Sequence, residues 1–296
     1  MNRWIVTLAA VAGLAAPLAA QQDSVRIQTI PVADGIYMLV GSGGNIGLAV
    51  GEDAIFLIDD QFAPLSQKIT DAIRAVSDKP VRFLLNTHWH GDHTGGNENF
   101  GKAGVLIVAH DNVRQRMSVD QFIAQFNQKV PASPKAALPV ITFSDVVTFH
   151  INGDDIHAIH VKNAHTDGDA VVHWQKANVM HMGDVFFNGM YPFIDLGSGG
   201  SINGMIAAAT AALGYANEST RIIPGHGALA GKADLAAFAA MLTSVRDNVQ
   251  RLVAQKKTLE QVLGAKPSAA WDEKWGKGFM KPDDFVTTVY QSLTTK

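Results

Sequence analysis

A short apolar run followed at once by metal-binding side chains constrains this chain more than any other stretch. The run from Val81 to Leu85 predicts a short buried strand. Three histidines and one aspartate then fall within six consecutive positions: His88, His90, Asp92 and His93. Imidazole nitrogens and carboxylate oxygens suit Zn²⁺ and similar divalent ions. The chain must therefore fold so that this strand ends at a metal site, and further ligands must come from elsewhere.

The spacing within this loop indicates two ions rather than one. On a loop that leaves a strand, His88 and His90 can point to one side, while Asp92 and His93 turn towards a second ion. Two ions that lie a few ångströms apart can hold one water between them and convert it to hydroxide at neutral pH. The alternative is a chance cluster of surface histidines. The order H-x-H-x-D-H followed by two glycines is instead typical of a catalytic loop.

This motif resembles the signature of the metallo-β-lactamase superfamily, and three later turns resemble the rest of that family's ligand set. They are the turn that begins at His165 and continues Thr-Asp-Gly-Asp, the turn Met-Gly-Asp that ends at Asp184, and the turn Pro-Gly-His-Gly around His226. The resemblance covers roughly residues 30–230. It implies an α/β (α+β type) fold, an αβ/βα four-layer sandwich, which a C-terminal helical extension would follow.

The resemblance also assigns the ligands to two zinc ions. It implies a first zinc on His88, His90 and His165, and a second zinc on Asp92, His93 and His226. Asp184 and a hydroxide would bridge the two ions, and iron or manganese could replace zinc. The five histidines at 150, 157, 160, 173 and 181, together with His110, are predicted to be structural.

The function implied is that of a binuclear zinc hydrolase. The bridging hydroxide would attack an amide- or ester-type bond, with Asp92 as the catalytic residue that orients it and takes its proton. β-Lactamase activity fits an exported chain. However, Asp184 stands where one β-lactamase subclass has cysteine, and no lysine follows it closely. Lactonase, glyoxalase II-like thioesterase and phosphodiesterase activities therefore remain alternatives. A non-catalytic zinc-binding protein or an iron redox protein would be a different class.

Composition narrows the partners of the chain. The 296 residues are 47% hydrophobic and 17% charged, as expected of a large globular domain with or without a small appendage. The formal net charge of -3 disfavours nucleic acid as a partner, so the expected partner is a small-molecule substrate. There is no cysteine, which excludes disulfides, thiolate ligands and a cysteine nucleophile. The sequence does not predict an oligomeric state.

The first twenty residues have the pattern of a secretory signal peptide. Arg3 precedes an uncharged, Ala- and Leu-rich segment from Trp4 to Leu18, and the small residues Ala19 and Ala20 follow. We expect cleavage near Ala20, a periplasmic or secreted protein, and no stable membrane association afterwards. A membrane anchor is the alternative, but the apolar run is short for a membrane span.

The resemblance implies a metallo-β-lactamase-like domain at residues 21–230, and the helical pattern of the rest predicts a helical extension at residues 231–296. Short strands are predicted at 25–30, 35–40, 45–50, 54–59, 105–109, 146–151, 155–161, 170–174 and 178–182. Helices are predicted at 64–78, 110–117 with Asp111 or Asn112 as its cap, 202–215 with Ser201 or Asn203 as its cap, and from 232 on. A short helix and then a loop are expected at 121–139.

Two surface features bear on substrate access. Gly41 to Asn45 reads equally as an ordinary hairpin turn or as a mobile flap over the metal site. Asn188 and Tyr191 follow Asp184 closely in the sequence, and we expect them to line the substrate pocket.

Overall fold

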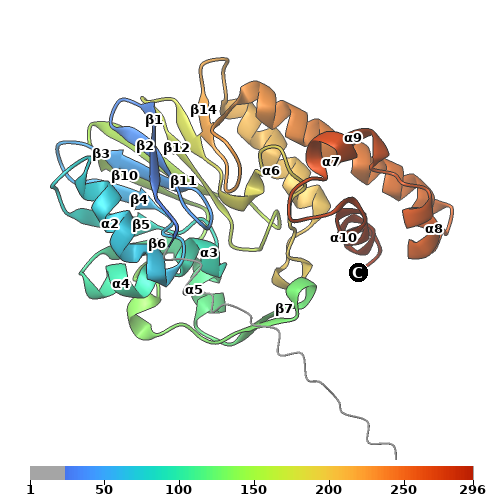
Figure 1. Cartoon of the computed structure of the whole chain (residues 1–296), viewed down its shortest axis with the longest axis horizontal. Coiled ribbons are helices and arrows are strands. Elements are labelled where there is room, and N and C mark those ends of the chain that lie inside the picture. The colour runs from blue at the N-terminus through green and yellow to red at the C-terminus, as the bar shows by residue number, and fades with distance from the viewer. Residues whose placement is uncertain (1–23, 296) are drawn as a thin grey trace, which may run out of the picture.

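Two β-sheets face each other and helices cover their outer faces, which gives the molecule four layers (Figure 1). The computed structural model describes residues 24–295, and the predicted signal peptide lies outside them. The α/β fold predicted from the sequence is thus confirmed, including the helices at its C-terminal end. Within residues 24–295, no helix has both the length and the apolar character needed to span a membrane.

The first sheet has seven strands in the order β1-β2-β3-β4-β5-β6-β9. Its first four strands form an antiparallel meander, and β5, β6 and β9 then add in parallel. The strands are β1 (Gln28–Ala33), β2 (Ile36–Val40), β3 (Ile46–Val50), β4 (Ile55–Ile58), β5 (Val81–Leu85), β6 (Leu106–His110) and β9 (Ile141–Phe143).

The second sheet has six strands in the order β10-β11-β12-β13-β14-β15. All of its pairs are antiparallel except β13 with β14, which run parallel. The strands are β10 (Val146–Ile151), β11 (Asp154–His160), β12 (Ala170–Trp174), β13 (Val179–His181), β14 (Arg221–Ile223) and β15 (Ala230–Gly231).

Helices lie at both outer faces and at the C-terminal end (Figure 1). They are α2 (Ser66–Arg74), α3 (Gly91–Thr94), α4 (Asn97–Lys102), α5 (Asp111–Met117), α6 (Ile202–Tyr215), α7 (Lys232–Ala254), α8 (Leu259–Gly264), α9 (Ala269–Trp275) and α10 (Pro282–Thr294). Ser201 caps α6 by accepting a hydrogen bond from the Gly204 amide, as predicted. The cap of α5 differs from the prediction, because the His110 side chain accepts from the Asn112 amide instead.

Three apolar clusters fill the spaces between the layers. In the first, Ile69 and Ile73 of α2 pack on one face of the first sheet. In the second, side chains such as Phe56 and Trp174 meet between the two sheets. In the third, α6 and α7 pack on the outer face of the second sheet, and α10 packs against both of these helices. Both sheets are therefore buried on both faces, which explains why their central strands are apolar runs rather than alternating patterns.

The segment from 121 to 139 corrects a prediction. Instead of a helix, it begins with a small hairpin of β7 (Gln121–Ile123) and β8 (Gln128–Val130), joined by the single 3₁₀ turn η2 (Ala124–Phe126). Asn127 closes the turn with a left-handed backbone, φ 48°, a conformation that asparagine tolerates better than most residues. The hairpin stands apart from both sheets at the lower edge of the molecule in Figure 1.

Candidate metal centre

The ligand loop leaves β5 directly, as the sequence predicts. β5 ends at Leu85, and the chain then passes His88 and His90 before the short helix α3 starts at Gly91. Asp92 and His93 lie on that helix, so their side chains point differently from the two histidines before it. The change from loop to helix lets four neighbouring residues serve two separate groups.

The other three candidate ligands come from the second half of the chain. His165 lies in the turn between β11 and β12, and Asp184 lies in the 3₁₀ turn η4 (Gly183–Val185) after β13. His226 follows β14, and a parallel bridge between Phe187 and His226 fixes its backbone. All three sit where strands end, so the two sheets deliver their ligands to the same edge of the sandwich.

The seven residues form two groups, and within each group the potential ligand atoms all lie within 4.8 Å of one another. One group is His88, His90, His165 and Asp184, and the other is Asp92, His93 and His226. In the first group, His90 Nδ1 lies 3.1 Å from His88 Nε2 and 2.8 Å from His165 Nε2. The structure thus brings together every residue that the sequence predicts as a ligand, in the predicted division.

Asp184 lies between the two groups. Its Oδ1 is 3.1 Å from His93 Nε2 and 3.4 Å from His226 Nε2. Its Oδ2 is 3.5 Å from His165 Nε2 and 3.9 Å from His88 Nε2. One carboxylate therefore presents one oxygen to each group, an arrangement suited to a ligand shared by two ions.

Contacts behind the cluster fix which nitrogen of each ring faces inward. His90 Nε2 donates to Asp195 Oδ2 at 3.0 Å, and His165 Nδ1 donates to the Phe193 carbonyl at 2.8 Å. His93 Nδ1 donates to Asp59 Oδ2 at 2.8 Å. When neutral, each of these rings then has its lone pair on the nitrogen that faces the cluster, the form that binds a metal.

Burial favours the neutral, metal-binding form of His88 and His165 in the first group. Burial lowers the pKa of His88 well below its usual value. Burial also lowers the pKa of His165 to about 4, against the opposing influence of Asp184. An imidazole that loses its proton this readily can offer its lone pair to a cation throughout the neutral range.

In the second group, histidines and carboxylates shift one another's pKa values. Burial opposes the charge on His226, but Asp184 and Asp92 outweigh it and raise the pKa of His226 to about 9. Despite burial, His93 and His226 lower the pKa of Asp92 to about 2. Without an ion, protons on the histidines balance these carboxylates. A divalent cation would displace them.

The cluster opens to solvent on the side of its second group. The side chains of Asp92 and His226 are 28% and 23% exposed, whereas those of His88, His93 and His165 are almost completely buried. Among these side chains, solvent reaches the cluster most readily at Asp92 and His226.

The turn from Gly41 to Asn45 is fixed to the ligand loops. The Gly44 amide donates to the Asp92 carbonyl at 3.1 Å, and the Asn45 amide donates to the Gly225 carbonyl at 2.7 Å. A Cβ on Gly44 would lie 2.0 Å from Cε1 of His93. Of the two readings left open by the sequence, these contacts fit a hairpin turn that packs on the site, and glycine is required there because His93 occupies the adjacent space.

The two predicted pocket residues lie elsewhere than expected. Tyr191 is fully buried, its hydroxyl donates to Asp272 Oδ1 at 2.8 Å, and its ring stacks on Phe285. This corrects the expectation that Tyr191 lines a substrate pocket. Asn188 supports the His226 loop, because its amide donates to the His226 carbonyl and its side chain to the Ala228 carbonyl. Contact between Asn188 and substrate stays a prediction.

Sequence reasoning missed the residues that support the ligands. Asp59 accepts from His93 and from both the amide and hydroxyl of Thr87, and its backbone is left-handed with φ 61°. Asp195 accepts from His90 and from the Ser198 hydroxyl. The only sequence signal for Asp59 is the pair of aspartates that closes β4, and Asp195 belongs to no motif.

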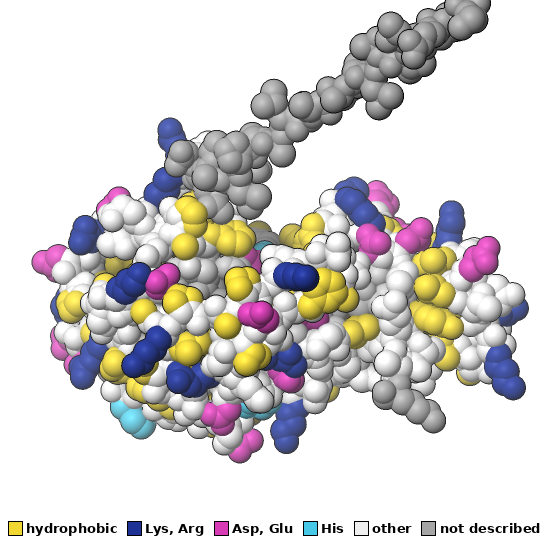
Figure 2. Space-filling model, turned by 90° about the horizontal axis from the view of Figure 1, so that it is seen from below, with side chains coloured by type: hydrophobic (Ala, Val, Ile, Leu, Met, Phe, Trp, Pro, Cys, Tyr) yellow, Lys and Arg dark blue, Asp and Glu magenta, His cyan; other side chains and the backbone are white. Residues whose placement is uncertain are grey.

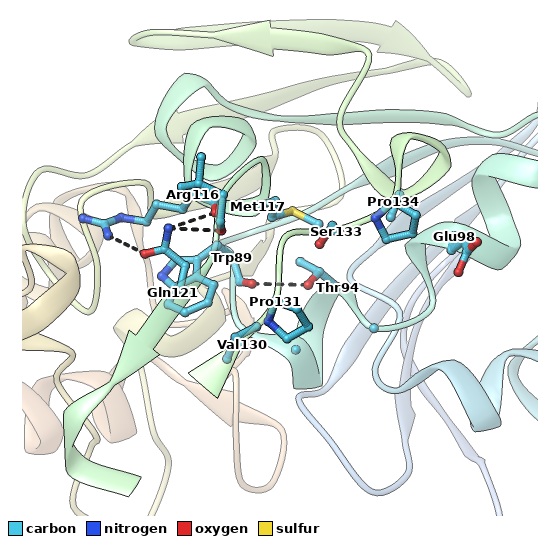
Figure 3. Close-up of a pocket in the computed structure, with 14 residues that line it drawn as sticks. Trp89, Thr94, Glu98, Arg116, Met117, Gln121, Val130, Pro131, Ser133 and Pro134 are labelled. Atoms are coloured by element: carbon cyan, nitrogen blue, oxygen red, sulfur yellow. Dashed lines mark hydrogen bonds between the residues drawn. The ribbon is translucent and has the colours of Figure 1, made fainter. Parts of the chain in front are cut away.

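A cavity of about 160 Å³ lies beside the ligand loop, between α5 and the β7–β8 hairpin (Figure 3). Trp89 and Thr94 form the wall nearest the loop, and the Thr94 hydroxyl donates to the Trp89 carbonyl. Arg116 reaches it from α5 but is engaged by Gln121 and Asp167. None of the seven cluster residues lines this cavity, so it is separate from the metal centre.

Comparison with known proteins places this geometry in a family. Residues 39–231 match the family model described as the metallo-beta-lactamase superfamily. A hydroxyacylglutathione hydrolase from Polaromonas sp. is 28% identical over 196 residues, which cover 62% of this chain and 66% of that protein. The chain thus spans just under two thirds of the length of that relative.

Solved structures share the fold at lower identity. A metallo-beta-lactamase from Pontibacter korlensis is 17% identical with a TM-score of 0.61, and the match covers 74% of this chain and 99% of that one. A stereoselective inverting sec-alkylsulfatase from Pseudomonas sp. is 15% identical with a TM-score of 0.64, and the match covers 92% of this chain and 51% of that one. At these identities the likeness establishes the fold alone.

Proposed function

Because the chain belongs to the metallo-beta-lactamase superfamily, we propose that it is a metal-dependent hydrolase whose cluster holds two divalent ions, which we expect to be zinc. The observation that carries the proposal is the position of Asp184. Its two oxygens face two separate groups of ligand atoms, with three further ligands in each group. A single-ion site has no need of a carboxylate with both oxygens directed to different sets of nitrogens.

The donor set fits such ions. His93 Nε2 and Asp184 Oδ1 are buried polar atoms without a well-formed hydrogen bond, a state that is costly unless another partner is bound there. The donors are nitrogen and oxygen, with no sulfur, which suits zinc and also manganese or iron. His88, His90 and His165 would hold one ion, and Asp92, His93 and His226 the other, with Asp184 between them.

In the proposed hydrolysis, the residues of the chain have different roles. Bound ions would supply Lewis acidity and an activated water at neutral pH. Asp92, at the open side, orients the attacking water through its carboxylate. Asp59 and Asp195 hold His93 and His90 in the orientation that ligation requires. The buried histidines behind Asp92 confine the water to one face of the cluster.

We further propose that the bond cleaved is of the acyl type, an ester, thioester or amide. Support comes from the relative from Polaromonas sp., whose name describes thioester hydrolysis. β-Lactam cleavage belongs to the same reaction class. Lactones are a further acyl substrate to test, and phosphodiesters are the alternative outside that class.

One experiment tests the proposal. The protein without residues 1–20 is loaded with zinc, its metal content is measured, and hydrolysis of a p-nitrophenyl ester, a hydroxyacylglutathione thioester, a lactone and a chromogenic cephalosporin is followed with and without chelator. We expect two zinc ions per chain and chelator-sensitive turnover of at least one acyl substrate. Asp92→Ala should reduce that turnover at least a hundredfold in a folded protein. Two bound ions without acyl hydrolysis would contradict the acyl proposal, and tightly bound iron would point to the redox class.

We also propose export to the periplasm or the outside of the cell. The support is the pattern of residues 1–20, with its positive start, apolar core and small residues at the end. The measurement is the N-terminal sequence of protein recovered from the periplasmic fraction. A new N-terminus near Gln21 would support the proposal, whereas an intact Met1 in the cytosolic fraction would contradict it.

A further inference from the structure

Two exposed phenylalanines flank the two halves of the cluster. Phe279, in the connection between α9 and α10, is 51% exposed. Its ring lies 6.5 Å from the ring of His226 and 6.2 Å from that of Phe187, and Phe187 itself stacks on His226 at 5.2 Å. An aromatic surface thus extends from the His226 ring out to solvent.

A second aromatic surface adjoins the other half. Phe126, at the tip of the β7–β8 hairpin, is 47% exposed and lies 4.8 Å from the ring of Phe193. Phe193 is buried and lies 5.7 Å from the ring of His90 and 5.6 Å from that of His165. The chain therefore places an exposed phenyl ring, directly or through one neighbour, against a ligand histidine of each group.

Single exposed apolar side chains are common on protein surfaces, but these two are placed unusually. They come from separate segments, the hairpin and the C-terminal helices, and both lead to the same cluster. On the face shown in Figure 2, hydrophobic side chains lie on both sides of the boundary between the larger part of the molecule, at the left, and the C-terminal helices, at the right. Apolar walls around a few converging polar groups are the usual form of a small-molecule site.

The charges around the opening argue against an anionic substrate group. Asp92 lies at the open side of the cluster, where its side chain is 28% exposed. Two lysines that flank Phe279 in the sequence have contacts of their own. Lys281 donates to the Gly278 carbonyl, and Lys274 lies over the Trp275 ring. A substrate carboxylate at the opening would therefore meet the carboxylate of Asp92.

We propose that the opening binds an uncharged, apolar acyl group, with Phe126 and Phe279 as the residues that select for it. This inference rests on the proposed function, since it assigns the substrate class of the same site. The two rings cover the chain of the acyl group while its carbonyl lies at the cluster. Binding should therefore strengthen as the chain lengthens, because each methylene removed from water adds to affinity.

Alkyl hydroxamates test this without turnover. They are bound to the zinc-loaded protein, and dissociation constants are measured by calorimetry for acetohydroxamate, octanohydroxamate and the monohydroxamate of suberic acid, which ends in a carboxylate. We expect octanohydroxamate to bind at least tenfold more tightly than acetohydroxamate, and the suberic compound to lose most of that gain. Equal binding of the short and long chains, or tighter binding of the carboxylate-ended chain, would overturn the proposal.

Variants locate the effect. Phe126→Ala and Phe279→Ala should each reduce the chain-length effect, the ratio of the dissociation constants of acetohydroxamate and octanohydroxamate, at least threefold. Phe279→Gln gives a second variant that keeps much of the volume. Tyr215→Ala is the matched control, because Tyr215 is a 58% exposed aromatic side chain on α6 that contacts His173 rather than the cluster. An undiminished chain-length effect in both phenylalanine variants would contradict the roles assigned to them.

The outcome can be separated from that of the proposed function. Metal-dependent acyl hydrolysis without a chain-length effect in hydroxamate binding would overturn this inference alone. A chain-length effect that depends on Phe126 and Phe279, without hydrolysis of any acyl substrate, would support the apolar binding site and contradict the proposed hydrolase function.

Discussion

At the scale of the residue, the position of each carboxylate matters more than how many carboxylates the cluster contains. The cluster contains two carboxylates, but Asp184 is shared by both groups, whereas Asp92 serves only the open one. Asp59 and Asp195 lie behind the histidines and contact them through the ring nitrogen that faces away from the cluster. An aspartate side chain thus has a different role according to the atom it faces: Asp59 and Asp195 support histidines, whereas Asp92 and Asp184 are candidate ligands.

The support of His90 by Asp195 gives a first prediction. Asp195→Asn keeps the size of the side chain but loses the charge that holds His90, so zinc affinity should fall roughly 10- to 100-fold. Competition with a chromophoric chelator measures it. Asp247→Asn, at an exposed aspartate on α7, is the control. Unchanged affinity in Asp195→Asn would show that the loop alone orients His90.

The space beside His93 gives a second prediction. Gly44→Ala places a methyl group where the His93 ring lies, so His93 must move and the second ion should be lost. Metal analysis should then give one zinc per chain instead of two. Gly214→Ala, on α6 with open space around it, should retain both. If Gly44→Ala binds two ions with wild-type affinity, the turn must be able to move away from the His93 ring, and the prediction is wrong.

The ligands could be predicted from sequence and their supports could not. His88 to His93 have a spacing that few other functions require, and the three later ligands lie in turns of a known order. Asp195 has no such spacing, and its importance depends on a fold that brings it to a histidine more than a hundred positions away. Tyr191 was misassigned for a similar reason, because closeness in sequence to Asp184 does not decide which way a side chain points.

At the scale of the element, capping and periodicity predict helices better than they predict short strands. Thr258 caps α8 with Gln261 in a reciprocal pair, and the start of that helix follows from the sequence. The strands β7 and β8 have only three residues each, too few for an alternating pattern to stand out. Their pairing depends on the turn at Asn127, which explains why a helix was expected there.

Docking of the C-terminal helices gives a third prediction. Tyr191 follows η4 closely and bonds to Asp272 of α9, so it links the site's framework to the extension. Tyr191→Phe should lower the free energy of unfolding by about 1–2 kcal/mol, because one buried hydrogen bond is lost while the packing stays. Urea unfolding measures this. Tyr290→Phe, whose hydroxyl makes only a long contact to the Lys257 carbonyl, should change stability less. Equal effects in the two variants would contradict the link.

At the scale of the whole molecule, the two sheets supply different candidate ligands to the same edge of the sandwich. The first sheet supplies four ligands in one loop, and the second supplies three from three turns. The four layers were predictable because a resemblance over most of the chain fixes the order of elements. The boundary between the domain and the extension at residue 230 stays a prediction.

Removal of the metal gives a fourth prediction. Since ions bind the folded cluster and not the unfolded chain, a free zinc concentration a thousand times the dissociation constant stabilises the protein by about 4 kcal/mol. Chelation should lower the melting temperature by on the order of 10 °C, and added zinc should restore it at two equivalents. A melting temperature insensitive to chelator would contradict a metal centre at this position.

The division of ligands along the chain has a consequence for synthesis. A nascent chain that has emerged as far as Asp184 already carries all the residues of the first group, whereas the second group waits for His226. The two groups of ligand atoms are therefore completed at different moments, and the group open to solvent is completed last. The chain thus holds every residue of the buried group before the last residue of the exposed group has been made.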